Sequence, residues 1–125
     1  MILGVGIDII EVARIAASLE KFGHRFGERI LSAEETQYCL SHASPAPFVA
    51  ARFAAKEAVS KAFGTGIGAH LGWQDMEIAH RVSGEPYVIL RGKGKKLFEA
   101  RKAKNLLVSI SHTKEYAAVV AILED

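Results

Sequence analysis

The chain has 125 residues, of which 50% are hydrophobic and 24% charged, and its formal net charge is +2. This length fits a single domain, residues 1–125, and the composition is that of a soluble globular protein. So small a net charge gives no bulk electrostatic basis for nucleic-acid binding. The lone cysteine, Cys39, excludes an internal disulfide and a cysteine-based zinc site. With no signal-like segment and no apolar run of membrane-spanning length, we expect a cytoplasmic protein that binds neither membrane nor nucleic acid.

The first predicted element is a strand over residues 2–10, where residue types alternate. Glycines inside a strand often mark the close approach of a ligand or of another backbone. Asp8 ends the glycine-bearing face and is therefore a candidate ligand-binding carboxylate, with capping of the following helix as its alternative role. The two faces are Leu3, Val5, Ile7 and Ile9 on one side and Gly4, Gly6 and Asp8 on the other.

A helix is predicted over about residues 11–22, with an apolar stripe for the core. Three cations gather on its opposite side: Arg14, Lys21 and, where the helical direction continues past Gly23, Arg25. An all-basic face is a candidate docking surface for an acidic partner, although a merely solvated face is the ordinary alternative.

One short, irregular helical region is predicted for residues 26–43, where Ser32 and Glu35 have the spacing of a capping box. The sequence then predicts a long central helix over about residues 45–63, rich in alanine and ended by Gly64.

The central helix is apolar nearly all round, yet it carries Lys56, Glu57 and Lys61. Charges in such a helix need partners or a ligand. Glu57 and Lys61 stand four residues apart in the order that favours a helical ion pair, which is the structural alternative to a ligand site.

After this helix, four glycines fall within residues 64–72, which leaves backbone amides free to turn towards a phosphate. The spacing matches neither the P-loop nor the dinucleotide fingerprint, so the loop alone is a weak indication. Two hairpins are predicted, 75–82 with 87–91 and 106–112 with 116–123, around a basic helix over 92–104. The last strand is apolar on both faces, which is typical of burial on both sides, as in a subunit interface.

Two carboxylates, Asp8 and Glu57, thus come from a strand and a helix that are both suited to close packing. Two oxygen ligands with room for water suit Mg²⁺, which also shares phosphate oxygens. Lys61 and the glycine loop fit a ligand that carries a diphosphate. His112, at the end of its strand, could reach the same ligand.

Three motifs in this order resemble bacterial holo-acyl-carrier-protein synthases, the small class of 4'-phosphopantetheinyl transferases, and the resemblance covers essentially the whole chain. It implies an α+β fold with an antiparallel sheet packed on a long central helix and further helices. It also implies transfer of 4'-phosphopantetheine from coenzyme A to a serine of apo acyl carrier protein, for fatty acid biosynthesis, with adenosine 3',5'-bisphosphate released. The motifs are Gly4-Val5-Gly6-Ile7-Asp8 with Arg14 downstream, Arg52-Phe53-Ala54-Ala55-Lys56-Glu57-Ala58 continuing to Lys61 and Gly64, and Ser109-Ile110-Ser111-His112.

By motif position, the resemblance implies that Asp8 and Glu57 ligate Mg²⁺ and that Lys61 contacts the phosphates and stabilises the departing bisphosphate. Either Glu57 or a metal-bound water would take the serine proton. Larger family members carry another acid at the position of Ile10, so two protein carboxylates are expected here. The expected coenzyme A contacts are Arg52, Lys56, Lys61, Gly64, Gly66 and His112.

The resemblance further implies a homotrimer with active sites between subunits, and docking of the acidic carrier protein on Arg14, Lys21 and Arg25. Three alternatives stay open from the residues alone. They are a small Mg²⁺-dependent diphosphate hydrolase, a ligand- or nucleic-acid-binding domain that uses residues 93–104, and a plain α+β domain whose charges form ion pairs.

Overall fold

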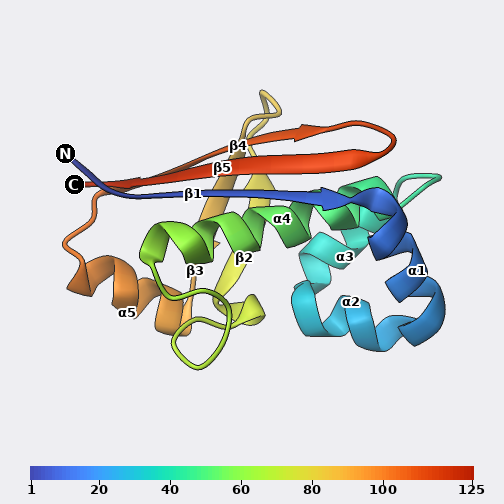
Figure 1. The fold of residues 1–125 in the computed structure, drawn as a ribbon, viewed down its shortest axis with the longest axis horizontal. Helices are drawn as coiled ribbons and strands as arrows, with labels where there is room; N and C mark the ends of the chain where they lie inside the picture. Colours follow the sequence, from blue (N-terminus) through green and yellow to red (C-terminus); the bar gives the residue numbers. More distant parts are fainter.

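The structure is a computed structural model that describes residues 1–125, and it confirms the α+β class (Figure 1). None of the helices has the length and apolar character that crossing a bilayer requires. In chain order the elements are β1 (Ile2–Glu11), α1 (Val12–Phe22), α2 (His24–Ile30), α3 (Ala33–Leu40), α4 (Ala46–Phe63), a 3₁₀ turn (Trp73–Asp75), β2 (Met76–His80), β3 (Pro86–Leu90), α5 (Gly92–Ala100), β4 (Asn105–His112) and β5 (Tyr116–Glu124).

Three long strands form an antiparallel sheet in the order β1-β5-β4, and α4 runs across one of its faces (Figure 1). The helices α1, α2 and α3 gather at one end of α4, and α5 lies at the other. The strands β2 and β3 form a separate hairpin. The predicted sheet on a long central helix, and both predicted hairpins, are confirmed.

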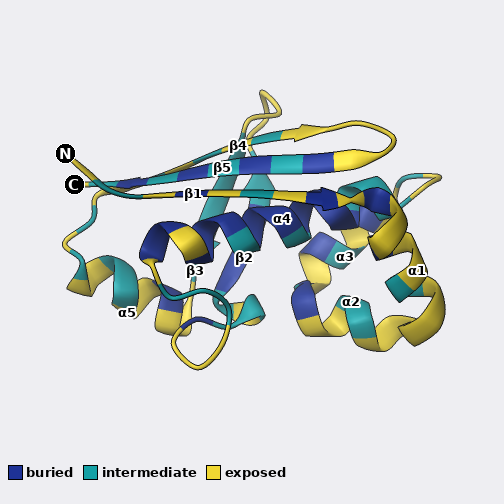
Figure 2. Ribbon diagram, viewed as in Figure 1, coloured by how far each residue is buried: buried dark blue, intermediate teal, exposed yellow.

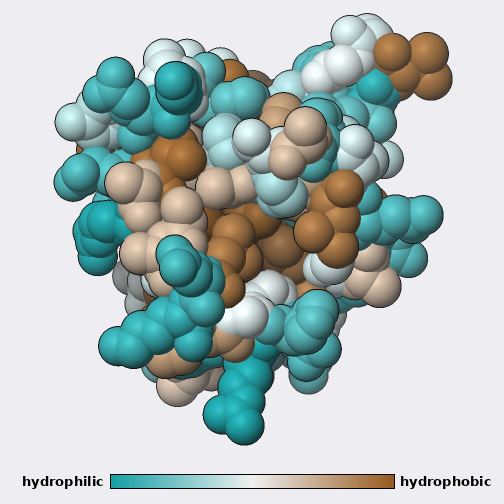
Figure 3. All heavy atoms as spheres, turned by 90° about the vertical axis from the view of Figure 1, so that its right-hand side faces the viewer, coloured by the Kyte–Doolittle hydropathy of each residue, from teal (hydrophilic) through white to brown (hydrophobic).

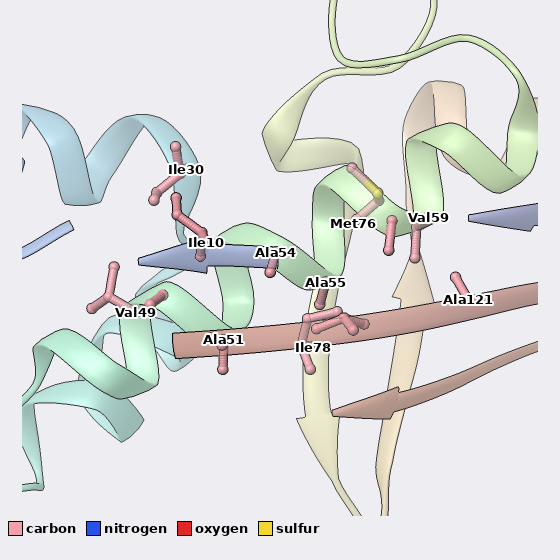
Figure 4. Packing of buried hydrophobic residues seen from close by; sticks show 14 of the residues in the cluster. Ile10, Ile30, Val49, Ala51, Ala54, Ala55, Val59, Met76, Ile78 and Ala121 are labelled. Carbon is pink, nitrogen blue, oxygen red and sulfur yellow. The ribbon is translucent and has the colours of Figure 1, made fainter. Parts of the chain in front are cut away.

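Helix α4 is the core of the molecule, because most of its surface is covered (Figure 2). Its alanines face β5, and β2 packs on the same helix, with Met76 near Val59 and Ile78 near Ala55 (Figure 4). The helix ends at Gly64, which adopts the left-handed conformation predicted for it, with φ 80°.

Strand β1 presses its two glycines against α4. A Cβ atom on Gly4 would lie 1.9 Å from the carbonyl oxygen of Ala62, and one on Gly6 would lie 1.9 Å from that of Ala58. No side chain fits at either position, so the two backbones approach each other directly. The predicted close approach is confirmed, and the same face of β1 carries Asp8 towards the helix.

The helical region predicted over residues 26–43 is two helices, because the chain is extended at Leu31 and Ser32. The capping box is confirmed: Ser32 Oγ accepts from the Glu35 amide at 3.2 Å, and Glu35 Oε1 accepts from the Ser32 amide at 3.0 Å. At the other end of the molecule, the basic helix stops at Ala100, and Lys102 takes a left-handed φ of 55°.

Candidate active site

Asp8 and Lys61 meet at the edge where β1 lies on α4. The Lys61 ammonium donates to Asp8 Oδ1 at 3.1 Å and to the Ile7 carbonyl at 2.9 Å. The Lys61 side chain is 49% exposed and that of Asp8 is 17% exposed, so the pair is open to solvent on one side. A ligand can therefore reach both groups.

Glu57 lies on α4, one turn before Lys61, and is half-buried. Burial raises the pKa of its carboxyl, the negative charge of Asp8 raises it further, and the charge of Lys61 opposes both. The two carboxylates therefore share one small region, with a single ammonium to offset them. The fold thus brings together the strand-borne acid, the helix-borne acid and the lysine that the sequence singled out.

A divalent cation fits this donor set, because two carboxylates beside one ammonium leave negative charge to neutralise. No group of three or more His, Cys, Asp or Glu side chains lies close enough to hold a metal ion. A metal held here would therefore have two protein ligands, in keeping with the expectation drawn from Ile10.

The glycine loop does not present its amides to a ligand as the sequence suggested. The amide of Gly64 donates to the Lys61 carbonyl, and that of Gly66 donates to the Ser60 carbonyl. The amide of Gly68 is likewise taken, by the Leu71 carbonyl. The glycines instead supply the left-handed backbone that turns the chain away from α4, with φ 80° at Gly64 and 66° at Gly66.

Lys56 requires a correction, because it is a buried structural residue. Its ammonium donates to Glu35 Oε1 at 2.7 Å, to the Ile30 carbonyl, and to the Trp73 carbonyl at 3.1 Å. A lysine has three protons to donate, and all three are taken inside the protein. Lys56 therefore has none left for coenzyme A in this structure.

Arg52 is also buried, so it does not present its guanidinium to a ligand as expected. Its Nε lies 3.8 Å from Glu35 Oε2, and the guanidinium sits 4.1 Å above the Tyr38 ring. Burial lowers the pKa of the neighbouring His80 imidazole, and the positive charge of Arg52 lowers it further. Arg52 and Lys56 thus turn one face of α4 into a charged core cluster.

Sequence reasoning missed Glu35 as the centre of this cluster. Its carboxylate joins Lys56, the Ser32 amide and, at 3.1 Å, the Ile78 amide, so it connects α3, α4 and β2. The capping-box spacing was the only signal, and such a glutamate normally faces solvent. The Glu35 side chain is buried because α3 packs against α4, and the local sequence does not indicate that contact.

The Glu35–Lys56 pair gives a stability prediction. Lys56→Met should lower the free energy of unfolding by about 3–5 kcal/mol, because it leaves the buried Glu35 carboxylate with only the more distant Arg52 as counter-charge. The double variant Glu35→Gln with Lys56→Met should lose less than the sum of the single variants, since both single changes remove the same Lys56–Glu35 contact. Urea unfolding of the four proteins measures the coupling. Additive losses would contradict a direct pair.

His112 lies apart from Lys61 within one chain. Its ring is 5.2 Å from that of Phe48, in the first turn of α4, whereas Lys61 is in the last turn. At 1.5 Å of rise per residue, about 20 Å of helix separates Phe48 from Lys61. The structure therefore places these expected ligand contacts at opposite ends of α4.

The three expected docking cations are all exposed, but they do not share one helix. Arg14 and Lys21 lie on α1, and Gly23, directly after that helix, turns the chain with φ 56° and ψ −132°. Arg25 lies on α2, the helix that follows this turn. None of the three takes part in an ion pair, so their charges are free to meet an acidic partner.

The sheet and the long helix thus each supply one acid to an edge where Lys61 also lies, and this arrangement suits binding of a phosphate-bearing ligand. Residues 4–121 match the sequence profile of the 4'-phosphopantetheinyl transferase superfamily. The chain belongs to this superfamily.

Within the superfamily, its relatives are holo-[acyl-carrier-protein] synthases. The one from Koribacter versatilis is 45% identical over 125 residues, which is 100% of both chains. The crystal structure of the Neisseria meningitidis synthase is similar with a TM-score of 0.93 and 33% identity, covering 100% of both chains. That of the Helicobacter pylori synthase in complex with coenzyme A has a TM-score of 0.86 and 33% identity, covering 96% of this chain and 99% of the other. The resemblance stated from the motifs is confirmed.

Proposed function

We propose that this chain transfers 4'-phosphopantetheine from coenzyme A to a serine of apo acyl carrier protein, with Mg²⁺ held by Asp8 and Glu57. The observation that carries the proposal is geometric: Asp8 of β1 lies 3.1 Å from the Lys61 ammonium, and Glu57 lies one turn before Lys61 on α4. The raised pKa of Glu57, caused first by burial and then by the charge of Asp8, agrees with this arrangement. We further propose that the reaction takes place in the cytoplasm and serves fatty acid biosynthesis.

In this reaction the serine oxygen forms a bond to the phosphorus next to pantetheine, and the bond from that phosphorus to the bridging oxygen breaks. Adenosine 3',5'-bisphosphate leaves with the electron pair. Lys61, half-exposed beside Asp8, is placed to donate to the phosphate oxygens and to stabilise the leaving group. Glu57 is one candidate for the group that takes the serine proton, and its raised pKa favours that role.

Mg²⁺, when bound, would offset the charge that develops on the diphosphate. The chain's own part is to hold the two carboxylates in place through the β1–α4 contact.

The remaining coenzyme A contacts are proposed at His112 and at Gly64 and Gly66, where the missing side chains, rather than free amides, leave open space near Lys61. Because His112 lies at the far end of α4, a second copy of the chain that supplies its own His112 would complete the site. Arg52 and Lys56 would contribute only indirectly. Their contacts with Glu35 in the core fix the position of α4, the helix that carries Glu57 and Lys61.

The test is incubation of the purified chain with apo acyl carrier protein, coenzyme A and Mg²⁺, followed by mass spectrometry of the carrier. We expect a gain of one phosphopantetheine and release of adenosine 3',5'-bisphosphate. A reaction without carrier protein separates the rival function: hydrolysis of coenzyme A there would indicate a diphosphate hydrolase. A carrier protein that stays unmodified in the presence of coenzyme A and a saturating concentration of Mg²⁺ would refute the proposal.

We infer that the outer face of the sheet is covered in a homotrimer. This face is apolar and open in the single chain, with Val5 57%, Ile7 67%, Ile9 66% and Leu107 51% exposed. The register places Val120 beside Ile7, at the centre of the same face. Apolar patches of this kind usually mark a contact between proteins.

A charged side chain introduced at the centre of this face would be buried in the trimer and should therefore prevent its assembly. Val120→Asp should shift the mass in solution from that of three chains to that of one, as measured by light scattering after gel filtration. Val82→Asp is the matched control, because Val82 is fully exposed at the β2–β3 turn. A wild-type mass of one chain would contradict the trimer.

Docking of an acidic carrier protein predicts a selective kinetic effect. Arg14→Glu should raise the KM for carrier protein by about tenfold while leaving the KM for coenzyme A nearly unchanged. Lys96→Glu, an exposed reversal on α5 at the opposite end of the molecule, should change neither constant (Figure 1). Equal losses for both substrates in Arg14→Glu would count against a docking role.

A further inference from the structure

A hollow of about 540 Å³ opens between α1, α2, α3 and the start of α4, at the end of the molecule away from α5. Figure 3 views this end, where apolar atoms gather around a central depression and hydrophilic atoms border it. Its floor is buried and apolar, formed by Leu31, Cys39 and Val49. A volume of this size lies within the range of small-molecule sites.

The hollow exists because small residues stand where larger ones would fill it. Ala16 of α1, Gly27 of α2 and Ala46 of α4 all line it. A Cβ atom on Gly27 would meet nothing within 4 Å, so the space beside this helix is open. A single larger side chain there would close it without any backbone clash.

The acidic side chains at the rim of the hollow indicate the charge of the ligand that it would bind. Glu20 of α1 and Glu28 of α2 line the hollow, and neither takes part in an ion pair. No lysine or arginine lines it, and His24 of α2 is the only basic side chain in the lining. A small anion inside the hollow would face these two carboxylates, whereas a cation would find them unpaired beside an apolar floor.

We propose that this hollow is a second ligand site, separate from the transferase site, for a small molecule with an apolar body and one protonated amine. The apolar body occupies the floor over Leu31 and Val49, and the ammonium lies at the rim with Glu20 and Glu28. The Cys39 thiol, also in the floor, stays neutral and acts as an apolar surface, since burial raises its pKa to about 11. The proposal does not depend on the chemistry at Asp8 and Glu57.

Three probes of one shape test the charge selection: 4-butylbenzylamine, which is a cation at pH 7, the neutral 4-butylbenzyl alcohol, and the anionic 4-butylbenzoate. Titrations followed by ¹H–¹⁵N NMR report both the affinity and the place of binding. We expect shifts confined to α1, α2, α3 and the first turns of α4, with the amine bound about tenfold more tightly than the benzoate. Equal binding of the two charged probes, shifts elsewhere, or no saturable binding of the amine would overturn the proposal.

Two variants separate the apolar from the charged contribution. Gly27→Leu should fill the hollow and abolish binding of all three probes, and it remains folded because leucine favours helix more than glycine does. Glu20→Gln with Glu28→Gln should remove the preference for the amine over the alcohol and leave the alcohol bound. Glu34→Gln, an exposed acid on α3 outside the hollow, should keep that preference. Undiminished amine binding in Gly27→Leu would refute the site.

Discussion

Asp8→Asn and Glu57→Gln should each lower the rate of phosphopantetheine transfer by about a hundredfold or more, because each removes one of only two carboxylates that could hold the metal. Neither change alters the size of the side chain, so the fold should persist. Glu34 is an exposed acid on α3, outside the candidate site, so the Glu34→Gln variant should transfer phosphopantetheine at the wild-type rate. The mass of the carrier protein over time measures all three variants.

The same variants should weaken metal binding when no substrate is present, as measured by calorimetry with Mg²⁺. Asp8→Asn should also bring the pKa of Glu57 down, because it removes one of the two causes that raise it. Carboxylate ¹³C NMR checks this shift directly. A Glu57 pKa that does not respond to Asp8→Asn would show that the two acids are too far apart to share an ion.

The raised pKa of Glu57 also sets the pH dependence of metal binding. A carboxyl with a raised pKa takes up its proton at a higher pH than an ordinary glutamate. The protonated form is a poor metal ligand, so the affinity for Mg²⁺ should fall as the pH drops through that pKa. Calorimetry at several pH values measures the fall, which should begin at a higher pH than for a site of ordinary carboxylates.

Gly6→Ala should lower the free energy of unfolding by about 3 kcal/mol or more and should separate Asp8 from Glu57. The added methyl group would lie 1.9 Å from the Ala58 carbonyl oxygen and 2.8 Å from the Ala62 amide, so β1 would have to move off α4. For a domain of this size the melting temperature should fall by roughly 10 °C. Transfer activity should drop even where the protein is still folded, since Asp8 lies two residues along the same face.

Gly68→Ala is the matched control for this substitution. A Cβ atom at Gly68 would meet nothing within 4 Å, and its φ is not in the left-handed region. The change should leave stability within about 0.5 kcal/mol of the wild type. If Gly6→Ala proved as stable and as active as Gly68→Ala, the close β1–α4 contact would not be what positions the site.

The residues of the candidate site could be predicted from the sequence, because each of them lies in a local pattern. Glycines alternating with Asp8 indicated a strand face without side chains, and the alanine-rich helix carrying Glu57 and Lys61 indicated a close partner for it. Neither pattern needs knowledge of distant residues. The motifs then linked the two through a family resemblance, which the comparisons confirmed.

Other features could not be derived in this way, because they depend on which surfaces meet. Lys56 and Glu57 are neighbours in sequence and both are charged. Successive helical positions are turned by about 100°, so Lys56 points into the core while Glu57 lies at the edge where β1 packs on α4. Only the packing of α3 against α4 supplied Glu35 as the partner that buries Lys56. In the same way, only the fold showed His112 far from Lys61 along α4.

By itself, then, the sequence determined the strands, the central helix with its stop at Gly64, and the acids and lysine of the candidate site, since alternation, helical period and glycine are local properties of the chain. The tertiary structure alone decided which cations are buried, which face of the sheet is left apolar and open, and where a hollow remains between helices. Burial depends on side chains that are distant in sequence, and no local pattern records them.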